Sequence, residues 1–395
     1  MKLKELAKAR MLASIGAGGV LYLSPLLFKD LGFSSTQIGI GITVAAISGT
    51  IARIVTGFFL DKGIQCSSPI KVAALFAIIA DLFLINSFDF TKYLQGQLFL
   101  GTAAGVYWPS AELSVPIFSG NYPSSKGFAL VRSADALGIF LGSSIGTISS
   151  WLGTIRSIYI VDIICMFLLF LIISQNFLKS TIRKNSNLNK DLSNNSKNKN
   201  NKNLIKSISG LLLISLYSTS IFSLLQSGLP LDLILGSELR PSLNQSISGL
   251  ILSVQLGLIL LFQWPIGRWL STKNINFSLR FSLFFIGNGC SFLALSSRFS
   301  FGLIFILFSL LFFAIGLTAF LPTATEGIIK ASSTHNRGIA MALFSQCFGI
   351  SAVIAPYVSG RLFDLTGNGI ILWSTLAMFA YILLPSTYIK KIIDY

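Results

Sequence analysis

Long apolar segments alternate with short polar ones along the whole chain, and many of the apolar segments run to 20 residues or more. A helix needs about 20 apolar residues to cross the hydrocarbon core of a bilayer. Alternating ten-residue segments, which would indicate a transmembrane barrel, are absent. The pattern predicts an all-α membrane protein with twelve transmembrane helices, near 11–30, 38–60, 70–88, 93–118, 127–150, 155–176, 207–228, 246–268, 277–297, 300–325, 338–362 and 368–388.

One polar segment is much longer than the others. Residues 179–206 consist almost wholly of Asn, Lys and Ser. Such a composition cannot bury enough apolar surface to offset the entropy that ordering would cost. We interpret this segment as a disordered linker that joins two six-helix bundles, residues 1–178 and 207–395.

The two parts on either side of this linker resemble each other. Three landmarks of the first part recur between 210 and 213 residues later: Gly57 as Gly267, Pro109 as Pro322, and Gly127 as Gly338. Three matches in nearly the same register indicate that one six-helix unit is duplicated.

The composition agrees with a membrane protein. The chain is 53% hydrophobic and only 11% charged, whereas soluble proteins carry about 25% charged residues. Its net charge of +16 would suggest nucleic-acid binding in a soluble protein. Here 22 of the 30 lysines and arginines fall on one side of the twelve predicted spans. The positive-inside rule then places the linker and both termini in the cytoplasm, and it explains the charge without a nucleic acid.

Several ionisable side chains lie inside the predicted spans. A charge at the centre of a transmembrane helix costs about 2.5–3.5 kcal/mol, so each such group needs a partner or a water-filled cavity. Arg53 lies close enough to a helix end for its side chain to reach the interface. Asp81 and Asp162 have no evident partner in the sequence. The full set is Arg53, Asp81, Glu112, Arg132, Asp135 and Asp162.

Three of these groups are predicted to form one cluster. Arg132 and Asp135 are three residues apart, which places them on one helical face where they can pair. Glu112 lies at a similar depth on the preceding helix. Together the three would carry one surplus negative charge. The cluster is either a structural salt bridge or a site for a substrate or coupling ion, and the sequence leaves both readings open.

Small residues mark one face of the predicted fifth helix. Gly138, Gly142 and Gly146 follow one another at intervals of four residues. This spacing allows a neighbouring helix backbone to approach closely. It predicts tight helix packing and indicates no chemistry by itself.

The turn between the second and third spans contains a short motif: Gly57, three further residues, then Asp61 and Lys62. This motif, at this place in a duplicated twelve-span chain, resembles the signature of the major facilitator superfamily. Gly267 and Arg268 stand where that family has its degenerate second copy. The resemblance implies a gating role for these five residues. Gly63 comes one position early, Gln97 replaces an arginine common in proton-coupled members, and the glycines after Gly138 lack a following proline.

The resemblance also implies which helices line a central cavity, namely spans one, four, seven and ten. Polar and aromatic side chains on these spans, with two glutamines from spans eight and eleven, are the candidate substrate contacts. They are Tyr22, Tyr107, Trp108, Tyr217, Gln226, Thr318, Thr323, Gln255 and Gln346.

These observations favour a secondary active transporter that works by alternating access. The resemblance favours ion- or proton-coupled efflux of a small molecule, with Glu112 or Asp135 as the proton-binding group. The alternatives are a permease for nutrient uptake and a membrane sensor that keeps the fold without transporting. No phosphate-binding loop, metal-ligand cluster or nucleophile elbow occurs in the sequence, so we expect neither an enzyme nor a cofactor. We expect a monomer in the plasma (inner) membrane.

Overall fold

The computed structural model describes residues 3–119, 124–176, 201–270, 272–332 and 337–389. These residues form helices joined by short connections, and no strand occurs among them. The helices are α1 Leu3–Asp30, α2 Ser35–Asp61, α3 Ser67–Ile85, α4 Phe90–Ser119, α5 Ser124–Trp151, α6 Ser157–Asn176, α7 Asn201–Leu235, α8 Gln245–Leu270, α9 Ile275–Ser296, α10 Gly302–Ala331, α11 Arg337–Thr366 and α12 Ile370–Ile389.

The all-α prediction is confirmed for the described residues. Nine of their helices contain an apolar stretch long enough to cross a membrane. The three others are α4, α5 and α12, so a full set of twelve spans stays a prediction. In α4 and α5 the apolar stretches are interrupted by glycine, serine and the charged residues Glu112, Arg132 and Asp135.

Two helices begin earlier than the apolar pattern predicts. α1 begins at Leu3, so it includes the charged residues that precede the apolar segment. α7 begins at Asn201, so residues 201–206 of the predicted linker are helical. A helix that is already nucleated extends at little cost into adjacent polar residues. Residues 177–200 of the predicted linker lie outside the described part of the chain.

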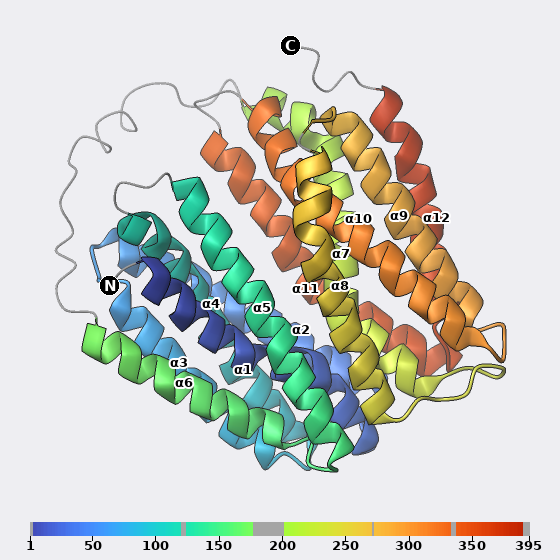
Figure 1. The fold of residues 1–395 in the computed structure, drawn as a ribbon, viewed down its shortest axis with the longest axis horizontal. Coiled ribbons are helices and arrows are strands. Elements are labelled where there is room, and N and C mark those ends of the chain that lie inside the picture. The colour runs from blue at the N-terminus through green and yellow to red at the C-terminus, as the bar shows by residue number, and fades with distance from the viewer. Residues whose placement is uncertain (1–2, 120–123, 177–200, 271, 333–336, 390–395) are drawn as a thin grey trace.

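The helices form two groups, α1–α6 and α7–α12, which lie side by side in Figure 1. The same helix pairs pack together in both groups. In the first group the pairs are α1–α5, α2–α4 and α3–α6, and their counterparts in the second group are α7–α11, α8–α10 and α9–α12. This correspondence agrees with a duplicated unit. The main contacts between the groups are α2 with α11 and α5 with α8. Replacing each helix by its counterpart in the other group turns one of these contacts into the other.

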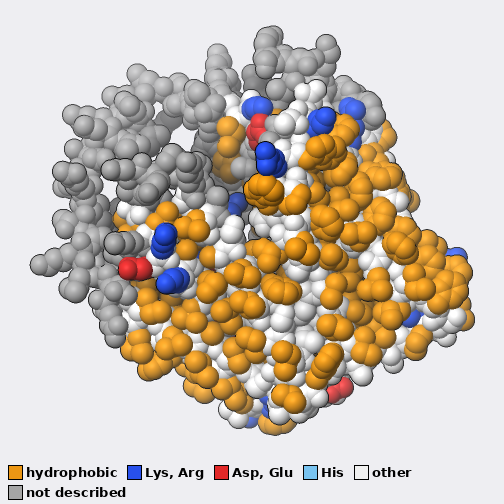
Figure 2. All heavy atoms as spheres, in the orientation of Figure 1, with side chains coloured by type: hydrophobic (Ala, Val, Ile, Leu, Met, Phe, Trp, Pro, Cys, Tyr) orange, Lys and Arg blue, Asp and Glu red, His pale blue; other side chains and the backbone are white. Residues whose placement is uncertain are grey.

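The outer surface is suited to lipid. Figure 2 shows hydrophobic side chains across the middle of one face, over both groups of helices, with charged side chains towards its edges. Large apolar side chains on peripheral helices are exposed, among them Phe167 of α6 and Phe379 of α12. Lipid tails would cover this belt, because a water-exposed apolar surface of this extent is not typical of a soluble monomer.

The glycine stripe of α5 packs against α1, as its spacing predicts. A Cβ atom at Gly138 would lie 2.5 Å from the carbonyl oxygen of Met11, and one at Gly142 would overlap the carbonyl oxygen of Ile15. Gly18 of α1 approaches the backbone of Ile139 in the same way. The backbones of the two helices are therefore in direct contact.

Hydrogen bonds between the two groups of helices lie at one end of the molecule. This contact end is where α2 and α8 begin and where α5 and α11 end. Four bonds represent it well: Thr43 Oγ1 to the carbonyl oxygen of Val353 at 2.9 Å, Thr147 Oγ1 with Ser253 Oγ at 2.9 Å, Ser150 Oγ with Ser246 Oγ at 3.3 Å, and Gln245 Nε2 to the carbonyl oxygen of Leu26 at 3.4 Å.

The packing between α2 and α11 loosens away from the contact end. A Cβ atom at Gly39 would overlap the carbonyl oxygen of Pro356, whereas one at Gly349 would meet nothing closer than 3.9 Å. A Cβ atom at Gly57, near the end of α2, would meet nothing within 4 Å. We call this opposite end, where α2 and α8 finish, the separated end.

An aspartate of one group caps a helix of the other. The backbone N–H groups of Ser35 and Thr36, in the first turn of α2, donate to Asp364 Oδ1 at 2.9 Å and to Oδ2 at 2.7 Å. The first N–H groups of a helix have no partner within the helix and carry a partial positive charge. The carboxylate of Asp364 therefore joins α11 to the start of α2.

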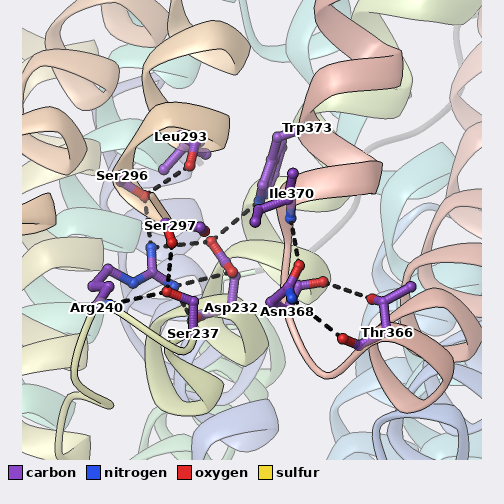
Figure 3. A network of polar contacts seen from close by, with 10 residues as sticks. All are labelled: Asp232, Ser237, Arg240, Leu293, Ser296, Ser297, Thr366, Asn368, Ile370 and Trp373. Atoms are coloured by element: carbon purple, nitrogen blue, oxygen red, sulfur yellow. Dashed lines mark hydrogen bonds and ion pairs between the residues drawn. The ribbon is translucent and has the colours of Figure 1, made fainter. Parts of the chain in front are cut away.

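A buried polar network braces the contact end of the second group, as Figure 3 shows. Arg240, in the connection between α7 and α8, pairs with Asp232 at 3.1 Å and donates to Ser296 Oγ at 2.7 Å. Trp373 Nε1 donates to Asp232 Oδ2 at 3.2 Å. The network ties the α7–α8 connection to α9 and α12.

The tryptophan donor can be tested separately from its ring. Trp373→Phe keeps most of the aromatic packing but leaves Asp232 with one hydrogen bond fewer. A hydrogen bond to a charged group contributes about 1.5–3 kcal/mol. We expect the purified variant to unfold at a lower temperature than the wild type, in a thermal shift assay in detergent. An unchanged melting temperature would show that this bond contributes little.

Candidate functional site

A buried arginine near the start of α1 organises the main polar site. Arg10 Nε donates to Asp135 Oδ1 at 3.2 Å, and its Nη2 also contacts Asp135 Oδ2. The same Nη2 lies 3.2 Å from Glu112 Oε1. Ser14, one turn further along α1, donates to Asp135 Oδ1 at 3.2 Å. We call Arg10, Glu112 and Asp135 the Arg10 cluster.

The cluster carries one surplus negative charge and is open on one side. Arg10 supplies one positive charge, and Glu112 and Asp135 supply two carboxylates. The side chain of Arg10 is 2% exposed and that of Asp135 is 12% exposed, whereas that of Glu112 is 37% exposed. Glu112 is therefore the member of the cluster that water or a ligand can reach.

Aromatic side chains of α4 border the cluster. The guanidinium of Arg10 lies 5.2 Å from the ring centre of Trp108, a cation–π contact. Tyr107 and Trp108 meet edge to face with ring centres 5.6 Å apart. Trp108 is partly exposed, so it offers an aromatic surface next to the charged groups.

The cation of this cluster differs from the one predicted from sequence. Arg132 was expected to pair with Asp135, but it is exposed and forms no ion pair with the described residues. The three-residue spacing permits such a pair without requiring it. Arg10 displaces Arg132 because the glycine stripe of α5 brings α1 against the face that carries Asp135.

The sequence contains a signal for Arg10. Arg10, Ser14 and Gly18 are spaced four residues apart, which places them on one face of a helix. This face of α1 contacts α5. The first predicted span, near 11–30, begins after Arg10, whereas α1 extends back to Leu3 and buries Arg10 within the helix bundle.

Among the contacts of the described residues, one pair of predicted cavity residues comes together across the two groups of helices. Gln226 Nε2 of α7 donates to the hydroxyl of Tyr22 of α1 at 3.4 Å. This contact lies on the contact-end side of the molecule, so the pair helps to join the groups there. The predicted substrate role of these two side chains stays a prediction.

Other predicted cavity residues are placed differently. Tyr217 donates to the carbonyl oxygen of Leu376 in α12 at 2.9 Å, so its hydroxyl points towards α12. Thr318 and Thr323 are buried and donate to carbonyl oxygens of their own helix. Gln346 is exposed.

Gln255 of α8 differs from the other cavity candidates. Its side chain is buried, and neither its Oε1 nor its Nε2 has a hydrogen-bond partner among the described residues. A buried amide without partners costs free energy, and the predicted substrate role of Gln255 stays a prediction.

The predicted gating residues lie at the separated end. Gly57 and Gly267 have open space around them. Lys62 caps α2, and its Nζ lies 4.2 Å from the ring centre of Phe58. Arg268 lies over the ring of Trp264 at 5.4 Å. Asp61 is the last residue of α2, and its side chain lies outside the described part, so its gating role stays a prediction.

No group of three or more His, Cys, Asp or Glu side chains that could hold a metal ion occurs in the described part of the chain. The four cysteines are free and buried, as small core residues are expected to be. The Arg10 cluster, with one cation and two carboxylates, is suited to binding a proton or a charged ligand group.

Solved structures with the same fold are known. The chain aligns over its full length with a structure described as the nucleoside transporter NupG, with a TM-score of 0.79, 16% identity and 100% of both chains covered. A POT family transporter in complex with 5-aminolevulinic acid gives a TM-score of 0.81 at 13% identity, covering 99% of this chain and 96% of that one. A peptide transporter POT in complex with alafosfalin gives 0.79 at 12% identity, covering 100% and 96%.

Identities this low show a shared fold, and the family follows from the sequence itself. No curated protein matches the chain. The family profile named Major Facilitator Superfamily matches residues 6–356, which is most of the chain. It also agrees with two six-helix groups that meet at one end and with polar groups buried between helices. The chain therefore belongs to the Major Facilitator Superfamily, whose members are membrane transporters.

Proposed function

We propose that this protein is a proton-coupled secondary transporter of a small organic molecule, with Glu112 as the group that binds the coupling proton. The observation that carries the proposal is the Arg10 cluster. Arg10 neutralises one of its two carboxylates, and the other negative charge is left on a cluster whose most exposed member is Glu112.

A proton on Glu112 would change how the cluster holds together. Arg10 contacts both carboxylates through one nitrogen, Nη2. When Glu112 binds a proton, its attraction for Arg10 falls, and the cluster becomes neutral. A neutral cluster is cheaper to enclose between helices than a charged one. Proton binding would therefore favour the conformation in which the separated end closes.

Neutralising Glu112 provides the test. In proteoliposomes, Glu112→Gln is expected to abolish accumulation of substrate driven by a proton gradient while it preserves exchange down a concentration gradient. Asp135→Asn should have the same effect if the two acids act as one unit. Both would be measured with a panel of radiolabelled compounds, with and without a proton gradient.

The matched control is Glu326→Gln, because Glu326 pairs only with Lys330 on the exposed surface of α10, at 2.6 Å. This variant should transport normally in both assays. If Glu112→Gln and Asp135→Asn still accumulate substrate against its gradient, the cluster is structural and coupling occurs elsewhere. If no compound in a broad panel is transported by the wild type, a sensor that keeps the fold becomes the better proposal.

For the direction of transport, we propose export of a lipophilic or amphipathic compound. Trp108 and Tyr107 beside the cluster support this substrate class, because they offer aromatic surface next to charge. The second candidate is a permease for a polar metabolite, which similarity to nucleoside and peptide transporters favours. The compound panel, applied to inside-out and right-side-out vesicles, distinguishes the two.

We also propose that the separated end faces the cytoplasm of the cell, as the distribution of lysine and arginine predicts. The native cysteines are buried, so introduced cysteines can report the orientation. In intact cells, a membrane-impermeant maleimide should label Lys92→Cys at the contact end. It should leave Lys273→Cys at the separated end unlabelled. The reverse labelling would invert the topology.

A further inference from the structure

Two aspartates outside the Arg10 cluster are buried against each other. Asp81 lies near the end of α3 and Asp162 in the second turn of α6. Their residues are 0% and 1% exposed. α3 packs against α6, and the two carboxyl groups lie close enough to interact with each other. We call them the aspartate pair.

No other group satisfies the pair. Neither oxygen of Asp81, nor Oδ1 of Asp162, has a hydrogen-bond donor among the described residues. Two carboxylates cannot hydrogen-bond to each other unless one carries a proton, because ionised carboxylates only accept. A proton shared between the two groups would supply the missing donor and remove one of two buried charges.

No described lysine or arginine forms an ion pair with either aspartate. The titratable neighbours on α6 are Tyr159 and Cys165, and both are neutral at ordinary pH. The hydroxyl of Tyr159 donates to Ser24 Oγ at 2.9 Å. Arg156 donates to the carbonyl oxygen of Ile85 and stacks on Phe88, and it forms no ion pair with either aspartate. On α1, a Cβ atom at Gly16 would overlap Asp162.

A cavity lies between Asp162 and side chains that contact the Arg10 cluster. It has a volume of about 110 Å³ and lies between α1, α3, α4 and α6. Asp162 lines it, as do Ser14, Tyr107 and Trp108. Ser14 donates to Asp135, and Trp108 packs on Arg10. Most of the remaining lining is alanine and other apolar side chains.

We propose that Asp81 and Asp162 form a second proton-binding site, which holds one proton between the two carboxyl groups and exchanges it through this cavity. A proton suits the site better than a metal cation. Hard cations such as Ca²⁺ and Mg²⁺ take about six or more oxygen ligands, whereas the pair supplies four carboxylate oxygens and faces apolar side chains. The presence of this proton does not depend on the proposed function. Its use in transport rests on the proposed function.

Infrared spectroscopy of the purified full-length protein tests the site without a transport substrate. The wild type at neutral pH should show the C=O stretching band of a protonated carboxyl group, with the shift expected on exchange into D₂O. Asp81→Asn combined with Asp162→Asn should lose this band. Each single variant should retain a shifted band, because the remaining acid is still buried and takes a proton. Asparagine is an isostere of a protonated aspartate, so the folded yield should be retained.

Asp89→Asn is the matched control, because the side chain of Asp89 is exposed and pairs with Lys92. Its spectrum should equal that of the wild type. The proposal is overturned if the double variant keeps the full wild-type band. It is also overturned if the band depends on replacing choline chloride by NaCl, because the pair would then bind a cation. If the band behaves as expected but transport is independent of protons, the proposed function fails and the site stands.

Discussion

Arg10→Ala is expected to remove most of the folded protein from the membrane. Asp135 is buried and receives its charge-assisted hydrogen bonds from Arg10, so the variant leaves a buried carboxylate with only Ser14 as a donor. Removing one partner of a buried ion pair costs about 3–5 kcal/mol, and domains are stable by only about 5–15 kcal/mol. The measurement is the monodisperse yield of a fluorescent fusion on size-exclusion chromatography.

Three companion variants separate charge from packing. Arg10→Lys should recover part of the yield, because a lysine supplies the charge without the planar fork that reaches two acids. Arg10→Ala combined with Asp135→Asn should recover more, since Asp135 then no longer leaves a buried carboxylate without its cation. Arg132→Ala should behave as the wild type. A loss of yield in Arg132→Ala equal to that of Arg10→Ala would support the pairing predicted from sequence and contradict the one described.

Gly39→Leu is expected to drive the protein out of the conformation described. At Gly39 even a Cβ atom would overlap the carbonyl oxygen of Pro356, so a leucine fits only if α2 and α11 separate at the contact end. A free-energy change of about 5.5 kcal/mol is enough to shift a two-state equilibrium from 99:1 to 1:99. Here the two states are the conformation with the contact end closed and the one with it open. Spin labels at Lys92→Cys and Glu238→Cys, one in each group of helices, should move apart in pulsed electron resonance measurements, and transport turnover should fall.

Gly57→Leu is the matched control for the distance measurement. It places the same side chain on the same helix at a position with nothing within 4 Å. The distance between the two labels should then equal that of the wild type. If Gly39→Leu leaves the label distance unchanged while the protein stays folded, the α2–α11 contact does not hold the two groups together.

Hydrophobic segments were sufficient to predict an all-α chain with helices of membrane length, because a membrane imposes a length on each apolar helix. The duplication was predicted from spaced landmarks such as Gly57 and Gly267, and the matching helix pairs agree with it. They were not sufficient for helix ends. The charged residues before the first apolar segment and the polar residues 201–206 extend α1 and α7, since helix propagation depends weakly on hydrophobicity.

The two acids of the candidate site were predicted from sequence, but their cation was not. Glu112 and Asp135 stand out because a carboxylate within an apolar helix is costly wherever it lies. Their partner depends on which helix packs against α5, and tertiary packing decides this. The glycine stripe predicted a close neighbour without saying that it is α1. Likewise, Asp81 and Asp162 are 81 positions apart in the sequence, and only the packing of α3 on α6 brings them together.

The cap that Asp364 provides on α2 has a kinetic consequence. Its two bonds join different groups of helices, so they must break each time the contact end opens and form again each time it closes. Each 1.36 kcal/mol added to a barrier slows a step tenfold. In the proposed transport cycle, a stronger cap would slow the opening of the contact end. A weaker cap would leave the other bonds at this end to keep it closed. The strength of this carboxylate cap therefore contributes both to the speed of the cycle and to how tightly this end is sealed.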